Sequence, residues 1–183
     1  MDIVETNLKG CFVLKPKIIE DERGYFMESF NESAFSKAIQ KEIHFVQDNQ
    51  SFSSKGVLRG LHYQVGQHAQ SKLIRVLNGE ILDVAVDLRP DSHTYGKYVS
   101  EILSSSNQKQ IFVPAGFAHG FLVLSDTATL FYKCDKFYNK ESEGGIFFDD
   151  KTLNVDWGNR AFDLIISEKD KHLPSFENAR KIW

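Results

Sequence analysis

The segment GVLRGLHYQ, residues 56–64, carries Arg59 and His62 among apolar and aromatic neighbours. A neutral histidine can move protons near neutral pH, and an acid paired with it raises its basicity and fixes its tautomer. Asp83 and Asp170 are the two acids that we consider as this partner. The alternative is a structural histidine with a satisfied hydrogen bond, which a single histidine without further context would favour.

Two further residues favour catalysis at His62. Lys72 follows soon after it, and Tyr132 lies inside the apolar segment ATLFYKC. Tyr132 alone would more often be a core tyrosine. Together, however, a base, a cation that can hold an oxyanion and a phenol that can return a proton form a coherent set for proton transfer.

The spacing of Arg59 and His62 sets a structural condition. In a regular strand, residues of unequal parity face opposite sides, so these two side chains should point apart. They can converge only if the strand is irregular between them, and Gly60 is the natural place for a bulge. By the same counting, Gln47 and Asn49 share a face, and so do Tyr132 and Tyr138 if one strand runs through both.

The six histidines also raise the possibility of a metal site. Metal-binding β-barrels usually present a second histidine two residues after the first, but that position after His62 is Gln64, and His119 stands alone in PAGFAHGF. His62 and His119 are too few ligands for a closed site, and neither has a cysteine beside it. Distant carboxylates could complete a site, but the pattern favours no metal.

The elements that must position these residues are mostly strands. Short apolar or alternating segments span residues 11–19, 24–30, 44–52, 72–89, 110–124 and 128–138. Asn78-Gly79 separates two such runs and predicts a hairpin. In residues 80–89, Ile81, Asp83, Ala85 and Asp87 form a mixed face that could point into a wet interior.

Helices are few in this pattern. Asn31 can cap a helix over residues 32–42, where Phe35, Ala38 and Ile39 form an apolar stripe. A second short helix is possible over residues 176–183. Many strands with few helices predict a single all-β domain over residues 1–183, an antiparallel sandwich or barrel of the jelly-roll kind.

Composition narrows the functional classes. The chain is 42% hydrophobic and 26% charged, with a formal charge of −3, which argues against nucleic-acid binding. Two cysteines, Cys11 and Cys134, do not form a disulfide framework, and no apolar run approaches the ~20 residues of a membrane span. We see no secretion signal and expect a cytoplasmic protein.

The motifs together resemble the dTDP-4-dehydrorhamnose 3,5-epimerases, nucleotide-sugar enzymes with a cupin jelly-roll fold and a few short peripheral helices. The resemblance runs nearly from end to end. It rests on DERGYFMESF, FVQDNQSFSSKGVLRGLHYQ, KLIRVLNGEILDVAVDLR, FVPAGFAHGFLVLSD, the Tyr132-Lys133 pair and GIFFDDKTLNVDW.

The resemblance implies a role for each candidate. His62 is the base, with Asp170 as its partner, Tyr132 is the proton donor, and Lys72 stabilises the enolate. Tyr138 matches the aromatic residue that stacks on the thymine ring. The other substrate-binding positions are Arg23, Phe26, Glu28, Gln47, Asn49, Arg59, His119, Glu143 and Lys169.

The resemblance also implies a metal-free homodimer without a cofactor, whose N-terminal segment crosses onto the partner. The expected reaction inverts C3 and C5 of dTDP-4-dehydro-6-deoxy-D-glucose. Three alternatives remain: an epimerase that inverts only C3 or C5 or uses a related nucleotide sugar, a metal-dependent cupin oxygenase, and a non-catalytic sugar-binding module.

Overall fold

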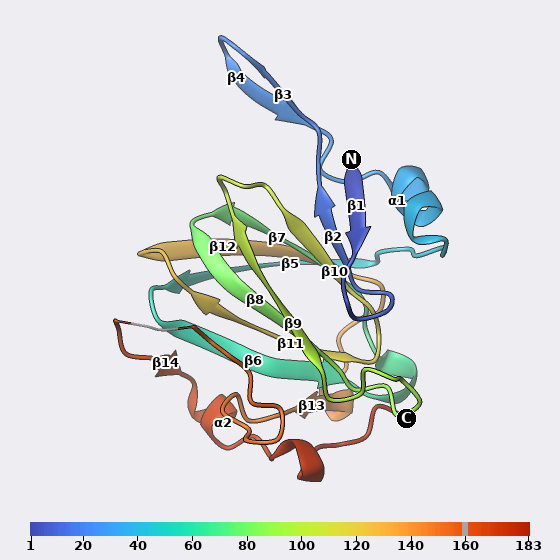
Figure 1. Cartoon of the computed structure of the whole chain (residues 1–183), viewed down its shortest axis with the longest axis vertical. Coiled ribbons are helices and arrows are strands. Elements are labelled where there is room, and N and C mark those ends of the chain that lie inside the picture. The colour runs from blue at the N-terminus through green and yellow to red at the C-terminus, as the bar shows by residue number, and fades with distance from the viewer. Residues whose placement is uncertain (159–160) are drawn as a thin grey trace.

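Two β-sheets hold most of the strands in the computed structural model, which describes residues 1–158 and 161–183 (Figure 1). Neighbouring strands run antiparallel except where β14 adds parallel to β6. The first sheet has the order β1 (Asp2–Glu5), β2 (Phe12–Lys15), β10 (Gln110–Val113), β7 (Lys72–Asn78), β12 (Thr127–Cys134) and β5 (Gln47–Ser54). The second has the order β13 (Glu143–Gly145), β6 (Val57–Gln64), β11 (Phe117–Val123), β8 (Glu80–Asp87) and β9 (Tyr98–Ser104), with β14 (Ile165–Ile166) beside β6.

This architecture confirms the predicted all-β, jelly-roll class. A separate hairpin, β3 (Ile18–Asp21) and β4 (Gly24–Met27), extends away from both sheets (Figure 1). The predicted strand over residues 11–19 is therefore divided between β2 and β3. Pro16 lies at the break, because proline has no N–H to donate to a strand ladder.

The helices of the described residues are short. Helix α1 (Glu32–Ile39) is present as predicted, with the Asn31 side chain accepting a hydrogen bond from the N–H of Ala34. Helix α2 (Glu168–Lys171) was not predicted, and three short 3₁₀ turns span Gly66–His68, Lys140–Ser142 and Phe176–Asn178. No helix in the part of the chain that the structure describes is long and apolar enough to cross a membrane.

The predicted helix over residues 176–183 is wrong. Only Phe176–Asn178 forms a 3₁₀ turn, and the backbone is extended again at Ala179. The chain beyond this turn binds other segments instead: the carbonyl of Arg180 accepts from the Tyr63 hydroxyl at 2.7 Å, and that of Ile182 accepts from Gly66 N at 2.6 Å. These contacts with β6 and the turn after it replace intrahelical bonds.

The hairpin predicted at Asn78-Gly79 is also wrong. Strand β7 is paired on both edges, with β10 and β12, and β8 is paired on both edges with β11 and β9. Neither strand has a free edge for the other, so the chain passes from one sheet to the other at this point. Gly79 has a φ of 82°, and a Cβ there would lie 2.0 Å from the carbonyl oxygen of Thr127. Gly79 therefore lies at the corner where the chain passes from the first sheet to the second.

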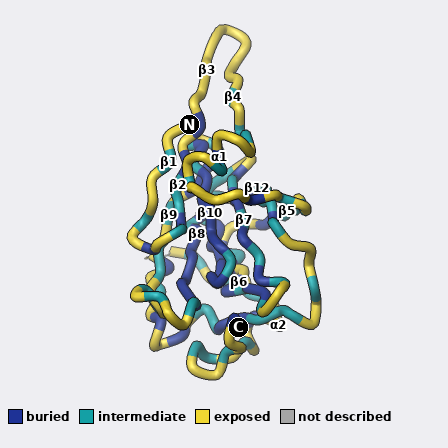
Figure 2. The backbone as a smooth tube through the Cα atoms, turned by 90° about the vertical axis from the view of Figure 1, so that its right-hand side faces the viewer, coloured by how far each residue is buried: buried dark blue, intermediate teal, exposed yellow. Residues whose placement is uncertain are grey.

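The two faces of β8 enter different parts of the core. Ile81 and Ala85 belong to the cluster between the sheets, whereas Val84 and Val86 pack on the outer face under the C-terminal segment. Residues 146–157 and 162–182 thus cover the outer face of the second sheet with little regular structure, as Figure 1 shows along β6. Figure 2 shows the sheet centres buried and the β3–β4 hairpin exposed along its length.

Strand β6 is irregular at Gly60, as the spacing of Arg59 and His62 required. His62 lies opposite His119 on β11, whereas Arg59 lies opposite Phe121, so the register shifts between these pairs. Gly60 has a φ of 120°. Its position is also crowded, because a Cβ on Gly60 would lie 2.6 Å from the Cα of Gly120 on β11.

The irregularity changes which residues of β6 face outward. Leu58 and Leu61 are three positions apart, yet both pack into the outer cluster. Arg59 faces the opposite sheet, where its Nε donates to Ser53 Oγ on β5 at 3.2 Å. Arg59 and His62 therefore lie on the same face, toward the space between the sheets.

We predict that Gly60→Ala destabilises the fold by about 2–5 kcal/mol, since it adds a left-handed φ penalty to a clash with β11. Chemical denaturation measures the free energy of unfolding. Gly66→Ala is the matched control, because Gly66 has a φ of 63° but open space around its Cβ position, and should cost only about 1–2 kcal/mol. Equal costs for the two variants would contradict the close approach of β6 and β11.

Candidate active site

A pocket of about 360 Å³ opens where the two sheets and the C-terminal segment meet. His62 and Gln64 reach it from β6, Lys72 from β7 and Tyr132 from β12. The pocket therefore gathers the proposed base, cation and phenol from three strands, of which β12 is distant in the sequence from β6 and β7. Its lining is Gln47, Asn49, His62, Tyr63, Gln64, Gln70, Lys72, Tyr132, Tyr138, Glu143 and Lys169.

Asp170, and not Asp83, contacts His62. Asp170 Oδ1 lies 2.7 Å from His62 Nε2, and its Oδ2 accepts from Gly60 N at 3.2 Å. Asp170 is 3% exposed and sits on α2, where the Ser167 side chain caps the helix by accepting from Asp170 N. One carboxylate thus binds both the imidazole and the irregular point of β6.

The electrostatics of this pair fix which nitrogen of the imidazole donates to Asp170. Burial by itself raises the pKa of Asp170, but the hydrogen bond and charge of His62 and the bond from Gly60 N outweigh it, so the net pKa is lowered. An ionised carboxylate can only accept, so Nε2 must carry the proton in this bond. In the neutral imidazole, Nδ1 of His62 then holds the lone pair that can take a proton from a substrate.

Lys72 and Tyr132 lie side by side in the pocket, with Lys72 Nζ 6.0 Å from the centre of the Tyr132 ring. Burial lowers the pKa of Lys72, while Cys134 and Asp83 act in the opposite direction. Burial raises the pKa of Tyr132, which keeps its phenol protonated, and Arg59 opposes this shift. Lys72 can place positive charge beside an oxyanion, and Tyr132 can donate a proton.

Arg59 and His119 lie outside the pocket lining, on neighbouring strands close to His62. Asp83, the other acid considered for His62, instead contacts His119: Asp83 Oδ2 lies 2.8 Å from His119 Nε2. Both residues are buried on the interior faces of β8 and β11. The mixed face predicted for β8 therefore supplies the acid of a second histidine–aspartate pair, whose histidine on β11 lies opposite His62.

The other end of the pocket is open and polar. Tyr138 is 54% exposed there, beyond the end of β12, so no single strand runs through Tyr132 and Tyr138. Lys169 Nζ donates to Glu143 Oε2 at 2.7 Å. Burial tends to raise the pKa of Glu143, but the bond and charge of Lys169 outweigh it and the net pKa is lowered. An exposed aromatic ring beside this ion pair can receive a planar base.

Arg23, Phe26 and Glu28 do not join this pocket. Arg23 and Phe26 are on the projecting β3–β4 hairpin, where Arg23 pairs with Asp21 and Phe26 is 70% exposed. Glu28 follows the hairpin and accepts from Asn31 Nδ2 at 3.2 Å. Within one chain, these three predicted binding residues are therefore separated from the other candidates.

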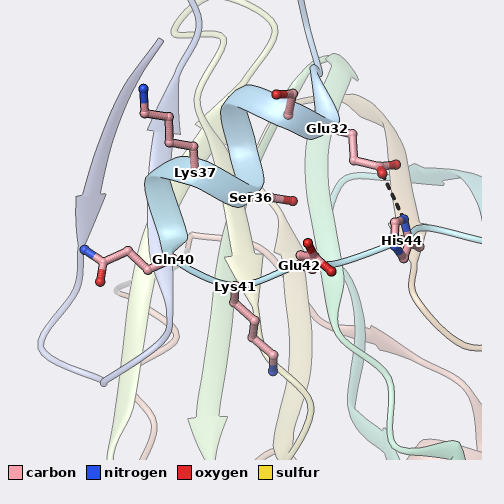
Figure 3. Close-up of a pocket in the computed structure, with 8 residues that line it drawn as sticks. Glu32, Ser36, Lys37, Gln40, Lys41, Glu42 and His44 are labelled. Atoms are coloured by element: carbon pink, nitrogen blue, oxygen red, sulfur yellow. Dashed lines mark hydrogen bonds and ion pairs between the residues drawn. The ribbon is translucent and has the colours of Figure 1, made fainter.

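A larger hollow of about 630 Å³ lies against α1, on the surface. Its lining side chains come from α1 and the segment after it, with Glu32 Oε1 2.8 Å from His44 Nδ1 (Figure 3). Glu32, Lys37, Lys41 and Glu42 present charges of both signs to solvent there. This hollow lacks the combination of base, cation and phenol found in the smaller pocket.

Comparison with known proteins identifies the family of the chain. Residues 5–178 match the sequence profile of dTDP-4-dehydrorhamnose 3,5-epimerase. The chain belongs to the dTDP-4-dehydrorhamnose 3,5-epimerase family. The match spans both sheets, the β3–β4 hairpin and α2, so it includes every residue proposed for the site.

Three relatives in this family are similar over nearly their whole length. The dTDP-4-dehydrorhamnose 3,5-epimerase of Methanothermobacter thermautotrophicus is 50% identical over 92% of this chain and 91% of its own. The crystal structure of the Elizabethkingia anophelis enzyme has a TM-score of 0.94 and 54% identity, covering 97% of each chain. The Legionella pneumophila dTDP-6-deoxy-D-glucose-3,5-epimerase, in complex with dTDP-4-keto-L-rhamnose, has a TM-score of 0.93 and 45% identity, covering 97% and 93%.

Sequence reasoning missed three residues that line this pocket, Tyr63, Gln64 and Gln70, and one helix beside it. Gln64 was considered only as a position without a metal ligand. The signal was available for Gln64, because it shares parity, and hence a face, with His62. The helix carrying Asp170 was also missed, although Ser167 three residues before an acid is a capping pattern.

We predict that Asp170→Asn makes unfolding less sensitive to acid. The folded pKa of Asp170 lies below its unfolded value of about 3.9, so its ionised form adds stability that is present above that value. This stability is lost as pH falls through the folded pKa. The difference in unfolding free energy between wild type and Asp170→Asn should therefore shrink as the pH falls below the unfolded pKa of about 3.9.

Urea denaturation over a pH series measures this difference. Asp149→Asn is the control, because Asp149 is an exposed aspartate paired with Lys151, and it should leave the pH profile nearly unchanged. A stability difference for Asp170→Asn that is constant from pH 7 to below pH 3 contradicts the ionised Asp170–His62 pair.

Proposed function

We propose that this protein is an isomerase that inverts C3 and C5 of dTDP-4-dehydro-6-deoxy-D-glucose, giving dTDP-4-dehydro-L-rhamnose in dTDP-L-rhamnose biosynthesis. The observation that carries the proposal is one pocket that holds the His62–Asp170 pair together with Lys72 and Tyr132. Membership of the epimerase family supports the substrate. Binding without chemistry would not need a base and an acid in the same pocket.

The proposed chemistry follows from the keto group at C4 of the sugar. The hydrogens on C3 and C5 are both acidic because either carbanion is delocalised onto the C4 oxygen. His62 Nδ1 removes one of these protons, and the C–H electrons form the enolate, whose negative charge Lys72 stabilises. One well-placed donor of this kind contributes about 3 kcal/mol to the transition state.

Reprotonation completes the inversion. Tyr132 donates its phenolic proton to the carbon from the face opposite His62, the enolate electrons return to the C–H bond, and the C4 carbonyl re-forms. Solvent then takes the proton from His62 and restores the one lost by Tyr132. Each positioned acid or base contributes about 10²–10⁴-fold. Because substrate and product are isomers, no net electron transfer is required.

The nucleotide would occupy the open end of the pocket. Tyr138 is exposed there and offers its ring to the thymine, and Gln47, Asn49, Glu143 and Lys169 provide polar groups around it. Arg59, which faces the space between the sheets, would add positive charge, and His119 would bind the sugar.

We also propose a homodimer in the cytoplasm. The β3–β4 hairpin leaves its own chain's sheets and exposes Phe26, which suits a segment that reaches into the pocket of a second copy with Arg23 and Glu28. Cys11 and Cys134 are buried free thiols, which fits a reducing compartment.

Deuterium exchange from D₂O into the 4-keto nucleotide sugar, followed by NMR, tests the function. We expect exchange at both C3 and C5 without added metal. His62→Asn should abolish exchange while thymidine diphosphate still binds, since the base is lost and the nucleotide end is intact. Tyr132→Phe should lower turnover by about 10²–10⁴-fold and still allow exchange, because solvent can return a proton.

Lys37→Met, on the far surface of α1, is the control and should match the wild type. Exchange at only one carbon would indicate a mono-epimerase. If neither carbon exchanged in metal-free buffer, the proposed reaction would be refuted. Undiminished exchange in His62→Asn would show that another base acts.

Mixing variants tests the shared site. A chain with Arg23→Ala and Phe26→Ala would inactivate the partner's pocket, because its hairpin lacks the two side chains. A chain with His62→Asn would inactivate its own pocket, because the base is missing. After exchange of subunits, a mixed dimer contains one pocket with intact His62 and an intact hairpin from the partner, so activity should reappear up to about a quarter of the wild-type value.

Subunit exchange should be verified by sedimentation and by tagging the two chains differently. Each variant alone should stay nearly inactive. If mixed dimers form and the activity of the mixture remains the sum of its parts, each chain uses its own hairpin or none.

A further inference from the structure

The loop that carries Tyr138, residues 135–139, leaves β12 at Cys134 and reaches the 3₁₀ turn at Lys140. We call it the Tyr138 loop. Phe137 and Tyr138 are both more than half exposed, so the loop has little apolar packing of its own at its tip. Its position must therefore come from polar contacts with the neighbouring elements.

Three glutamine side chains supply such contacts. From Lys136 to Asn139, each residue has a backbone group bonded to one of them. Gln70 Nε2 donates to Lys136 O at 2.7 Å, and Gln47 Oε1 accepts from Tyr138 N at 3.0 Å. Gln64 is bonded to the loop on both sides of Tyr138.

The contacts of Gln64 use both ends of its amide. Its Oε1 accepts from Asn139 N at 2.6 Å, and its Nε2 donates to Phe137 O at 3.4 Å. The same Nε2 donates to His68 O at 2.8 Å, which ties the loop to the turn after β6. Gln64 is only 5% exposed, so these bonds are shielded from competing water.

Gln64 also stands on the strand of the base. It lies two residues after His62 in β6, on the same face, and both line the pocket. The backbone of one strand thus links the imidazole that would act on the sugar to the loop that would hold the thymine. A shift of the loop would change the span between these two points.

We propose that Gln64 is a positioning residue for nucleotide binding: it holds the Tyr138 loop at a fixed place relative to His62, and so selects substrates in which a planar base is joined to the reacting sugar by a diphosphate. This inference rests on the proposed function. Gln64 acts through Tyr138 and touches no reacting atom.

Gln64→Met tests the inference, since it keeps the length of the side chain and removes both bonds to the loop. We expect the Kd for thymidine diphosphate and the KM for the nucleotide sugar to rise about tenfold, as for one or two lost hydrogen bonds, with kcat within about twofold of wild type. Gln64→Glu keeps the bond from Asn139 N and loses the Nε2 donor that binds Phe137 O. The same binding and kinetic measurements on this variant test the inference if Gln64→Met fails to fold.

Gln67→Met is the matched control. Gln67 is exposed in the adjacent turn, and its amide contacts the ring of His68 at 3.3 Å. It should leave Kd, KM and kcat at wild-type values. Thermal unfolding of all variants separates a local effect from loss of the fold.

A double variant separates positioning from direct contact. If Gln64 acts through Tyr138, then Gln64→Met combined with Tyr138→Ala should bind thymidine diphosphate no more weakly than Tyr138→Ala alone. Additive losses would overturn the inference, and so would a fall in kcat at unchanged KM.

Thymidine diphosphate binding also separates this inference from the proposed reaction. A wild-type protein that binds the nucleotide but exchanges no deuterium would refute the epimerase activity and leave the role of Gln64 to be decided by the variants. A wild-type protein that does not bind thymidine diphosphate would overturn the role of Gln64.

Discussion

The carboxylate of Asp170 is the contact on which the geometry of the site depends. One oxygen binds His62 and the other binds the N–H of Gly60, so a single buried group holds both the imidazole and the place where β6 changes face. Without that change, Arg59 and His62 would point to opposite sides of the sheet. The segment that covers the outer face of the sheet, which includes α2, therefore fixes how Arg59 and His62 are oriented on the inner face.

The pocket separates two electrostatic environments. At its inner end, burial lowers the pKa of Lys72 and raises that of Tyr132, so both groups are tuned by loss of water. At its outer end, Glu143 and Lys169 form a partly exposed ion pair beside Tyr138. The inner end suits a transient negative charge on a sugar oxygen, and the outer end suits a ligand that must enter and leave.

Local sequence signals predicted those elements whose conformation depends on residues close together in the sequence. The Asn31 cap and the Phe35 stripe predicted α1, and parity along GVLRGLHYQ identified Gly60 as the place where an irregularity would let Arg59 and His62 converge. Asn78-Gly79 failed because a hairpin also needs a free strand edge, and whether an edge is free depends on strands distant in the sequence. The C-terminal segment failed for a related reason, because its backbone bonds go to β6 and the turn after it.

The site was predictable in its chemistry more than in its geometry. Residue types pointed to His62, Lys72 and Tyr132, and the structure places them in one pocket. Residue reasoning could not choose between Asp83 and Asp170, since strand parity gives no distance between elements. The resemblance selected Asp170, and the contact with His62 agrees. The separation of Arg23 and Phe26 from that pocket could not be read from parity, because it depends on where the hairpin leaves the sheets.

The contact between His62 and Asp170 joins residues that are 108 positions apart. During synthesis on the ribosome, the strands that supply His62, Lys72 and Tyr132 emerge well before α2. A nascent chain can therefore build most of its two sheets while its histidine still lacks an acid. Because loop-closure entropy grows only slowly with length, this late contact costs little more than a nearer one would. The order of translation thus delays the assembly of the His62–Asp170 pair until the segment that covers the outer face has been made.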